Sequence, residues 1–318
     1  MRGRRFIIAA GLLGLAACTD FPGNPSVAPA APPPAPPAQE PAPDLVGLPA
    51  SPESAALATY YQRLQTDLLT RGLMRGDGGG PDTPFTDTML ARNFIRIALF
   101  DEYVDDGSSI RSQATPSRLR RWEKPVRMSV VSGPSSDAER QRADRANVRE
   151  YAARLARLTG VQITQTDVAP NFYVFFVNED ERRALGPRIR QIVPNIAESS
   201  LRAMVDLPRD QLCMVVAFAD GNSTAYDTAI AIVRAEHPDL LRLTCIHEEL
   251  AQGMGLANDS PRARPSIFND DEEFGLLTTQ DEMMLRMLYD PRLRTGMSAA
   301  EAAPIVRQIA AEYLAGNT

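Results

Sequence analysis

Histidine is scarce in this sequence, since only His237 and His247 occur among its 318 residues. Two imidazoles exclude a three-histidine zinc site built from this chain alone. The sequence also lacks the Gly-x-Ser-x-Gly elbow of serine hydrolases and the glycine-rich loop that binds nucleotide phosphates. Positive charge is in shortage too, because 34 Lys and Arg stand against 40 Asp and Glu, and the net charge is -6. We therefore expect no nucleic acid among its partners.

Cysteine is also rare, and the first of the three copies follows an N-terminal targeting sequence. Arginines at positions 2, 4 and 5 precede an apolar run over residues 6–15 that is too short to span a membrane as a helix. The run ends in Leu15-Ala16-Ala17-Cys18, which resembles the lipobox of bacterial lipoproteins. The resemblance implies a signal peptide over residues 1–17 and a lipid anchor on Cys18. The alternative is an ordinary secretory signal that ends near a cysteine.

The residue after Cys18 indicates which membrane would hold the lipid anchor. It is Thr19 rather than Asp, so the sorting rule of bacterial lipoproteins favours the outer membrane, facing the periplasm, over the inner membrane. The other two cysteines, Cys213 and Cys245, form an even pair in such an oxidising compartment. Such a pair predicts a disulfide bond from an apolar strand to the helix behind it, and the alternative is two unpaired buried thiols.

Three regions are expected after the signal peptide. Residues 18–52 are rich in Pro and Ala, which predicts an extended tether between the lipid anchor and a folded domain. Residues 53–120 are expected to be an N-terminal helical extension, because leucines and tyrosines recur every three or four positions from Ser54 to about Met74. A second apolar segment there, Met89 to Tyr103, fits either a helix or a strand. Residues 121–318 are expected to form the main domain.

The main domain is predicted to have an α/β (α+β) fold. Met214 to Ala219 is apolar throughout, which predicts a central strand covered on both faces. The remaining expected strands are residues 126–131, 161–166, 171–177 and 228–233. Helices are expected over residues 137–159, 239–255, 281–289 and 298–314.

The helix over residues 239–255 carries the most informative stretch of the sequence. Residues 248–258, Glu-Glu-Leu-Ala-Gln-Gly-Met-Gly-Leu-Ala-Asn, follow the spacing of the H-E-x-x-H-x-x-G-x-x-H zinc motif. Glu249 holds the place of the general base, and the three ligand places hold Glu248, Gln252 and Asn258. His247 is one residue out of that frame, on an apolar stripe, and is expected to be a core histidine rather than a ligand.

Two later segments extend the resemblance to metzincin peptidases. Residues 265–269, Pro-Ser-Ile-Phe-Asn, are similar to the Met-turn of matrixin-like members, with Phe268 in place of the Met. Residues 277–289 are similar to the C-terminal helix of that group. Residues from Trp122 to about Met297 thus resemble a zincin of the metzincin type. The resemblance implies a twisted mixed sheet with a long helix and the motif helix packed on it, followed by C-terminal helices.

A further resemblance covers the motif, the Phe268 segment and residues 288–292, which are similar to an uncharacterised family of bacterial lipoproteins with a domain of unknown function. That resemblance implies no known activity. In the ligand places, Glu248, Gln252 and Asn258 offer one carboxylate and two amide oxygens, and Asp259 would add a second carboxylate. Such hard donors suit Ca²⁺ or Mg²⁺ better than Zn²⁺. The alternative is a hydrogen-bonded polar cluster with no cofactor, which we expect here.

Two functions from different classes are consistent with these residues. The first is an envelope lipoprotein with a degenerate, non-catalytic metzincin-like site that binds a peptide or cell-wall component by strand addition beside the motif helix. The alternative is a metallohydrolase in which Glu248, Gln252 and Asn258 hold the ion, Ca²⁺ or Zn²⁺, and Glu249 is the base. The acidic run at residues 270–272 is expected to be a solvated loop. The sequence leaves the physiological ligand and the oligomeric state open.

Overall fold

The computed structural model describes residues 50–105, 110–269 and 271–315, which belong to one compact unit spanning residues 42–318. The expected signal peptide, Cys18 and nearly all of the Pro/Ala-rich tether lie outside the described residues. Within these described ranges, no helix is both long enough and apolar enough to cross a bilayer.

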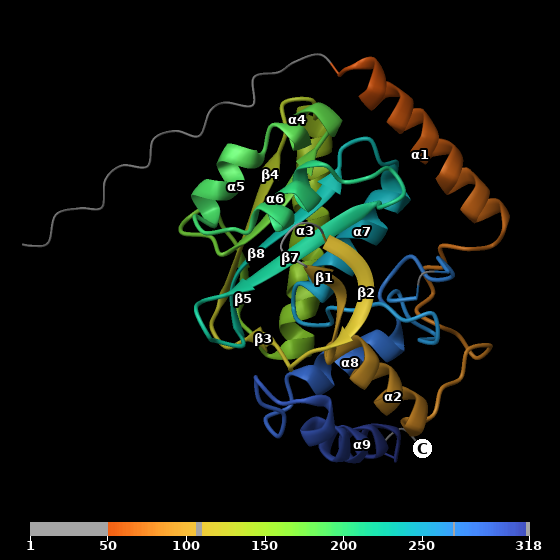
Figure 1. The fold of residues 1–318 in the computed structure, drawn as a ribbon. Coiled ribbons are helices and arrows are strands. Elements are labelled where there is room, and N and C mark those ends of the chain that lie inside the picture. The colour runs from red at the N-terminus through yellow and green to blue at the C-terminus, as the bar shows by residue number, and fades with distance from the viewer. Residues whose placement is uncertain (1–49, 106–109, 270, 316–318) are drawn as a thin grey trace, which may run out of the picture. The chain divides into compact units, whose positions relative to one another are not determined.

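A six-stranded mixed sheet forms the centre of the fold (Figure 1). Four strands lie side by side in the order β5-β4-β6-β8, and the short strand β3 pairs with the beginning of β8. These five strands are parallel, whereas β7 pairs with β8 in the antiparallel sense. The strands are β3 (Arg121–Trp122), β4 (Val126–Ser132), β5 (Ile163–Gln165), β6 (Phe172–Val177), β7 (Cys213–Ala219) and β8 (Ala225–Arg234).

Helices cover both faces of the sheet. The long helix α3 (Ala138–Thr159) and the motif helix α7 (Asp239–Gln252) pack on one face and contribute to the main hydrophobic core. The short helices α4 (Glu179–Arg183), α5 (Gly186–Ile192) and α6 (Glu198–Val205) belong to the opposite face, where a second core lies. The period of two along β6 divides its side chains between the cores: Phe172, Val174 and Phe176 enter the main core, and Phe175 and Val177 enter the second.

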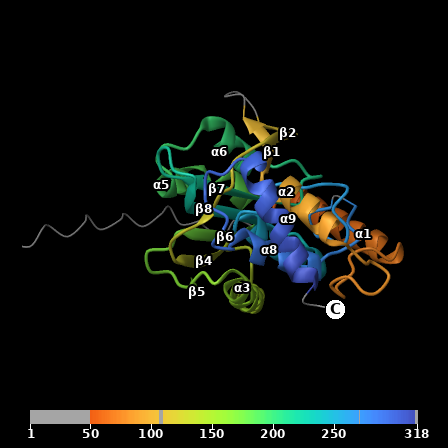
Figure 2. The ribbon, with the colours of Figure 1, turned by 90° about the horizontal axis from the view of Figure 1, so that it is seen from below.

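Three helices gather at one end of the described unit (Figure 2). They are α2 (Asp87–Ala98), α8 (Thr279–Leu288) and α9 (Ala299–Ala315), and all three contribute to the main core. Helix α1 (Pro52–Thr70) contacts α4 and α7. The segment that fitted either a helix or a strand contains both, because α2 is followed by β1 (Phe100–Asp105), which forms an antiparallel pair with β2 (Ile110–Pro116).

The structure confirms the α/β class and the C-terminal helices, but it corrects the place of one strand. Among the described residues β7 pairs with β8 alone, so it is an edge strand rather than a central one. Its uniform hydrophobicity has another cause. Met214 faces the second core, and Cys213 and the partly buried Val215 face the main core. Burial of both faces requires helices on both sides of the sheet, and it does not require a strand on each edge.

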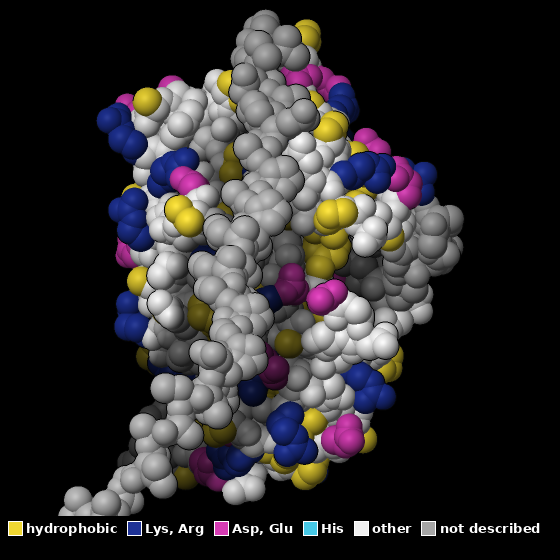
Figure 3. All heavy atoms as spheres, turned by 90° about the vertical axis from the view of Figure 1, so that its left-hand side faces the viewer, with side chains coloured by type: hydrophobic (Ala, Val, Ile, Leu, Met, Phe, Trp, Pro, Cys, Tyr) yellow, Lys and Arg dark blue, Asp and Glu magenta, His cyan; other side chains and the backbone are white. Residues whose placement is uncertain are grey.

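Charge is mixed over the surface. In Figure 3, basic and acidic side chains are interspersed on the visible part of the face that the described residues form.

Candidate functional site

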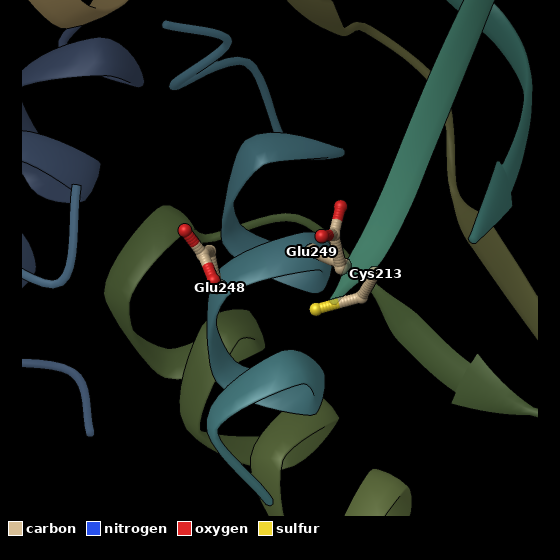
Figure 4. A group of neighbouring side chains, drawn as sticks. All are labelled: Cys213, Glu248 and Glu249. Carbon is tan, nitrogen blue, oxygen red and sulfur yellow. The ribbon is translucent and has the colours of Figure 1, made fainter. Parts of the chain in front are cut away.

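A disulfide bond joins the motif helix to the edge strand. Cys213 at the start of β7 and Cys245 in α7 are bridged, with their Cα atoms 5.9 Å apart, which confirms the predicted pair. The bond fixes the side of α7 that carries the motif against β7. Figure 4 shows Glu249 projecting from α7 toward the start of β7, beside Cys213.

A cleft of about 410 Å³ opens between α7, β7 and β1. Glu248, Glu249 and Gln252 of α7 line it, together with residues 212–215 at the start of β7. Acidic side chains dominate its wall, and among its described lining residues none is Lys or Arg. The six acidic residues that line it are Glu102, Asp210, Glu248, Glu249, Asp259 and Glu272.

The structure brings two of the three expected ligand places together. Glu248 and Gln252 line the cleft, whereas Asn258 is buried outside its lining and donates its amide N–H to the carbonyl oxygen of Arg96 at 2.9 Å. The next residue, Asp259, lines the cleft instead. The Gln252 amide donates to the Asp259 carboxylate at 3.1 Å, so Gln252 orients that carboxylate.

Glu249, in the place of the general base, is the most deeply buried carboxylate of the motif. Its side chain is 4% exposed, and its Oε2 atom has no hydrogen-bond partner within the described residues. One carboxylate oxygen of Glu248 and one of Glu249 lie within 4.8 Å of each other and of Cys213 Sγ. That sulfur belongs to the disulfide, so it is not a thiolate and is not counted as a metal ligand.

The cleft is unfavourable for negative charge. Loss of hydration, and then the charges of Asp259 and Glu249, raise the pKa of Glu248 well above its ordinary value. Loss of hydration, and then the charges of Glu102 and Asp259, raise the pKa of Glu249 in the same way. The cleft therefore favours the protonated form of these two carboxyl groups more than water does, and a bound cation would favour the ionised form.

Three acidic residues of the cleft were missed by sequence reasoning: Glu102, Asp210 and Glu272. Glu102 comes from β1, and no spacing pattern connects it with a helix that begins at Asp239. Glu272 belongs to the acidic run that was expected to be a solvated loop. Asp271 in that run is exposed, but Glu272 is partly buried and lines the cleft. Its backbone is left-handed, with φ at 57°, and its carbonyl accepts a hydrogen bond from the Met74 amide at 2.8 Å. The clustering of acidic residues after the Phe268 segment was the available signal.

His247 is a core histidine, as its position on the apolar stripe predicted. Its ring stacks on Tyr151 with 4.1 Å between centroids, and its Nδ1 accepts a hydrogen bond from the Leu277 amide. Burial lowers the pKa of His247 to about 3, so the ring is neutral. The other histidine, His237, is also buried, with its Nδ1 3.6 Å from Cys245 Sγ.

The segment that resembles a Met-turn is held by a buried carboxylate. Phe268 is fully buried in the main core. Asp281 of α8 accepts hydrogen bonds from the Ser266 hydroxyl, the Ile267 amide and the Thr278 amide, all within 3.0 Å. Burial raises the pKa of Asp281 to about 6. This carboxylate thus ties the turn to the start of α8.

A second cavity of about 290 Å³ continues the cleft along β7. The two cavities share Glu102, Met214, Val215 and Gln252, and the second one extends past Val216 to Ala217. Consecutive residues of a strand point to opposite faces, so a groove lined by all of them follows the strand's edge. The groove along β7 therefore exposes the edge that β8 does not use.

The fold and the site together define the class of protein: an α/β protein with an acidic cleft between a helix and a sheet edge that no other described strand covers. The chain belongs to the family described as "Protein of unknown function (DUF2927)", which it matches over residues 87–308. The match includes α2, the whole sheet and the motif helix. No curated protein and no solved structure matches the sequence.

Proposed function

We propose that this chain is a lipid-anchored envelope protein with a degenerate metzincin-like domain that binds an extended peptide or a cell-wall component without cleaving it. The observation that carries the proposal is the edge of β7 that pairs with no other described strand and borders a continuous groove beside α7. Extended peptides bind such edges by adding a strand, with backbone hydrogen bonds giving affinity and neighbouring pockets giving specificity.

The residue types in the motif support binding rather than hydrolysis. The three ligand places hold Glu, Gln and Asn rather than three His. The side-chain amide of Asn258 donates a hydrogen bond to the carbonyl oxygen of Arg96. The order of elements also agrees with the resemblance seen in the sequence: a strand, a long helix, further strands, and then the helix with the motif. The lipid anchor rests on the sequence up to Cys18.

The test uses proline substitutions in β7. In an antiparallel strand, consecutive residues direct their N–H groups alternately to the paired neighbour and to the open edge. Val215→Pro and Val216→Pro therefore form a matched pair. We expect one variant to lose stability, because its N–H bonds to β8, and the other to fold normally but to lose peptide binding.

Binding is measured with a peptide library passed over the immobilised chain, and folding by circular dichroism. The proposal is wrong if the variant that folds normally retains the peptides as the unchanged chain does. A peptide ligand is excluded if the unchanged chain retains none of the peptides, and the proposal as a whole is wrong if the chain also retains no cell-wall fragments.

One observation favours a second candidate, a metallohydrolase. Glu249 presents an unpartnered, buried oxygen at the wall of the cleft, in the place of a general base. A cation held by Glu248 and Gln252 would supply an acidified water, and Glu249 would accept its proton. Cleavage of a mixed peptide library that is lost in Glu249→Gln would establish this candidate in place of the first.

A further inference from the structure

The cleft beside α7 is lined by six acidic residues, and none of its described lining residues is Lys or Arg. Arg120 lines the adjoining cavity, but its guanidinium already pairs with Asp101. The cleft itself is lined by carboxylates from four separate segments: β1, the loop before β7, α7 with the turn after it, and the loop at Glu272. Groups of like charge from distant segments converge at a cost, which a bound cation would remove.

We propose that Glu248 and Glu249 bind one hard divalent cation, Ca²⁺ in particular, and that Asp259, Glu102 and Glu272, which line the same cleft, turn toward it as further oxygen ligands. The proposed cation site deepens the proposed function. Its existence is independent of that function, and only the role given to the cleft rests on the proposed function. A cation held by Glu249 leaves that carboxylate unavailable as a general base. The site would then organise a binding groove rather than a hydrolytic centre.

Geometry supports one shared ion. Calcium binds oxygen ligands at roughly 2.3 to 2.6 Å, so two oxygens on the same ion are at most about 5 Å apart. One oxygen of Glu248 and one of Glu249 meet that limit, because they lie within 4.8 Å of each other. Asp259, Glu102 and Glu272 line the same cleft but are not in that group, so their side chains would move toward a bound ion.

A second, independent observation is Oε2 of Glu249, which is buried at the cleft wall and has no hydrogen-bond partner in the described part of the chain. A buried acceptor without a partner destabilises the folded chain. A cation in the cleft would satisfy it.

The number of carboxylates favours a metal ion over an ammonium group. A lysine ammonium has only three N–H donors, whereas Ca²⁺ takes about six to eight oxygen ligands. Five carboxylates and the water that reaches an open cleft match the larger shell. Gln252 completes the arrangement, because its amide holds the Asp259 carboxylate in place at 3.1 Å.

The donor set disfavours zinc. Zinc prefers imidazole and thiolate, but Cys213 and Cys245 are joined as a disulfide. His247 is stacked on Tyr151, and its Nδ1 is bonded to the Leu277 amide. The ionisable groups that remain among the described lining residues are carboxylates, and such oxygen donors select Ca²⁺, Mg²⁺ or Mn²⁺.

The experiment is calorimetric titration of the full-length chain, kept in detergent and stripped with a chelator, with CaCl₂, MgCl₂, MnCl₂ and ZnCl₂. We expect one Ca²⁺ per chain, bound more tightly than Zn²⁺. Glu249→Gln and Glu248→Gln should each weaken Ca²⁺ binding by about tenfold or more, because each removes a charged ligand. Glu150→Gln, at an exposed position of α3, is the matched control and should bind as the unchanged chain does.

Thermal unfolding of each variant without metal confirms that it is folded, and Glu248→Gln, at a half-exposed position, provides the test if Glu249→Gln fails to fold. The site is refuted if the unchanged chain binds none of the hard cations, if Zn²⁺ binds most tightly, or if both Gln variants bind Ca²⁺ normally. Lysine peptides that bind through Glu249 in excess chelator, with no Ca²⁺ uptake, would assign the cleft to an ammonium group instead. Peptide binding that persists in chelator would leave the proposed groove standing even if the ion site fails.

Discussion

Glu249 and Glu248 are the residues at which the chemistry of the cleft is concentrated. Both carboxyl groups have a pKa well above its ordinary value, because the cleft removes their hydration and surrounds them with like charges. Each folded-state pKa lies above that of the unfolded chain, so the folded chain holds protons that the unfolded chain has released above about pH 4.5. The stability that these groups contribute is therefore present at low pH and is lost as the pH rises through their folded pKa.

We predict that the metal-free chain has a lower free energy of unfolding at pH 8 than at pH 5. A single group contributes up to about 1.4 kcal/mol per pH unit within its window. Urea unfolding of the unchanged chain and of Glu249→Gln, both in chelator, measures the slope, which should be shallower in the variant. Equal slopes would contradict the raised pKa of Glu249. The charged groups that face it across the cleft are Glu102, Asp210, Glu248, Asp259 and Glu272.

At the scale of elements, the turn that follows α7 requires glycine at position 255. Gly255 has φ at 123°, and a Cβ there would lie 2.3 Å from the carbonyl oxygen of Arg120. We predict that Gly255→Ala lowers the free energy of unfolding by about 3 kcal/mol or more. The control is Gly160→Ala at the end of α3, where φ is 72° and no atom lies within 4 Å of the Cβ, so the cost should be about 1 kcal/mol. Chemical unfolding of both variants decides, and similar losses would disprove the steric account.

The disulfide is the second element-scale constraint, because it joins β7 to α7. It closes a loop with a sequence separation of 32. We predict that Cys213→Ala with Cys245→Ala lowers the free energy of unfolding by roughly 2 to 4 kcal/mol. Adding a reductant to the unchanged chain should reproduce most of that loss, and the double variant should not respond to it. A double variant as stable as the unchanged chain would show that the bridge contributes nothing.

The hydrophobic periodicity of the sequence predicted where helices and strands lie along the chain. It did not predict which elements lie side by side in the fold. Alternation of apolar residues predicts the strands around Val126 and Phe172. Helical spacing predicts the helix α3, and the side chain of Asp137 caps it by accepting a hydrogen bond from the Arg140 amide. The edge position of β7 could not be predicted, because strand order is decided by long-range pairing. The same limit applies to the cleft: Glu248 and Gln252 share a helix face, but the path after Gly255 places Asp259, not Asn258, beside them.

At the scale of the whole molecule, we propose a folded unit held by a lipid anchor on Cys18. We predict that Cys18→Ser abolishes membrane association. The expected products are a soluble chain or an unprocessed precursor, because no acyl chain can be attached. Fractionation of cells that express each form measures this, with Cys213→Ser as a control that keeps the anchor. Equal amounts in the outer-membrane fraction for both forms would contradict the lipobox assignment.

The central claim is that the groove along β7 holds an extended ligand intact. The most direct measurement is mass spectrometry of a peptide library incubated with the full-length chain and Ca²⁺, in which retained peptides and new fragments are counted in the same sample. The account predicts a retained set of uncleaved peptides and no fragments beyond those formed with Glu249→Gln. Fragments that depend on Glu249, or the absence of any retained peptide, would contradict it.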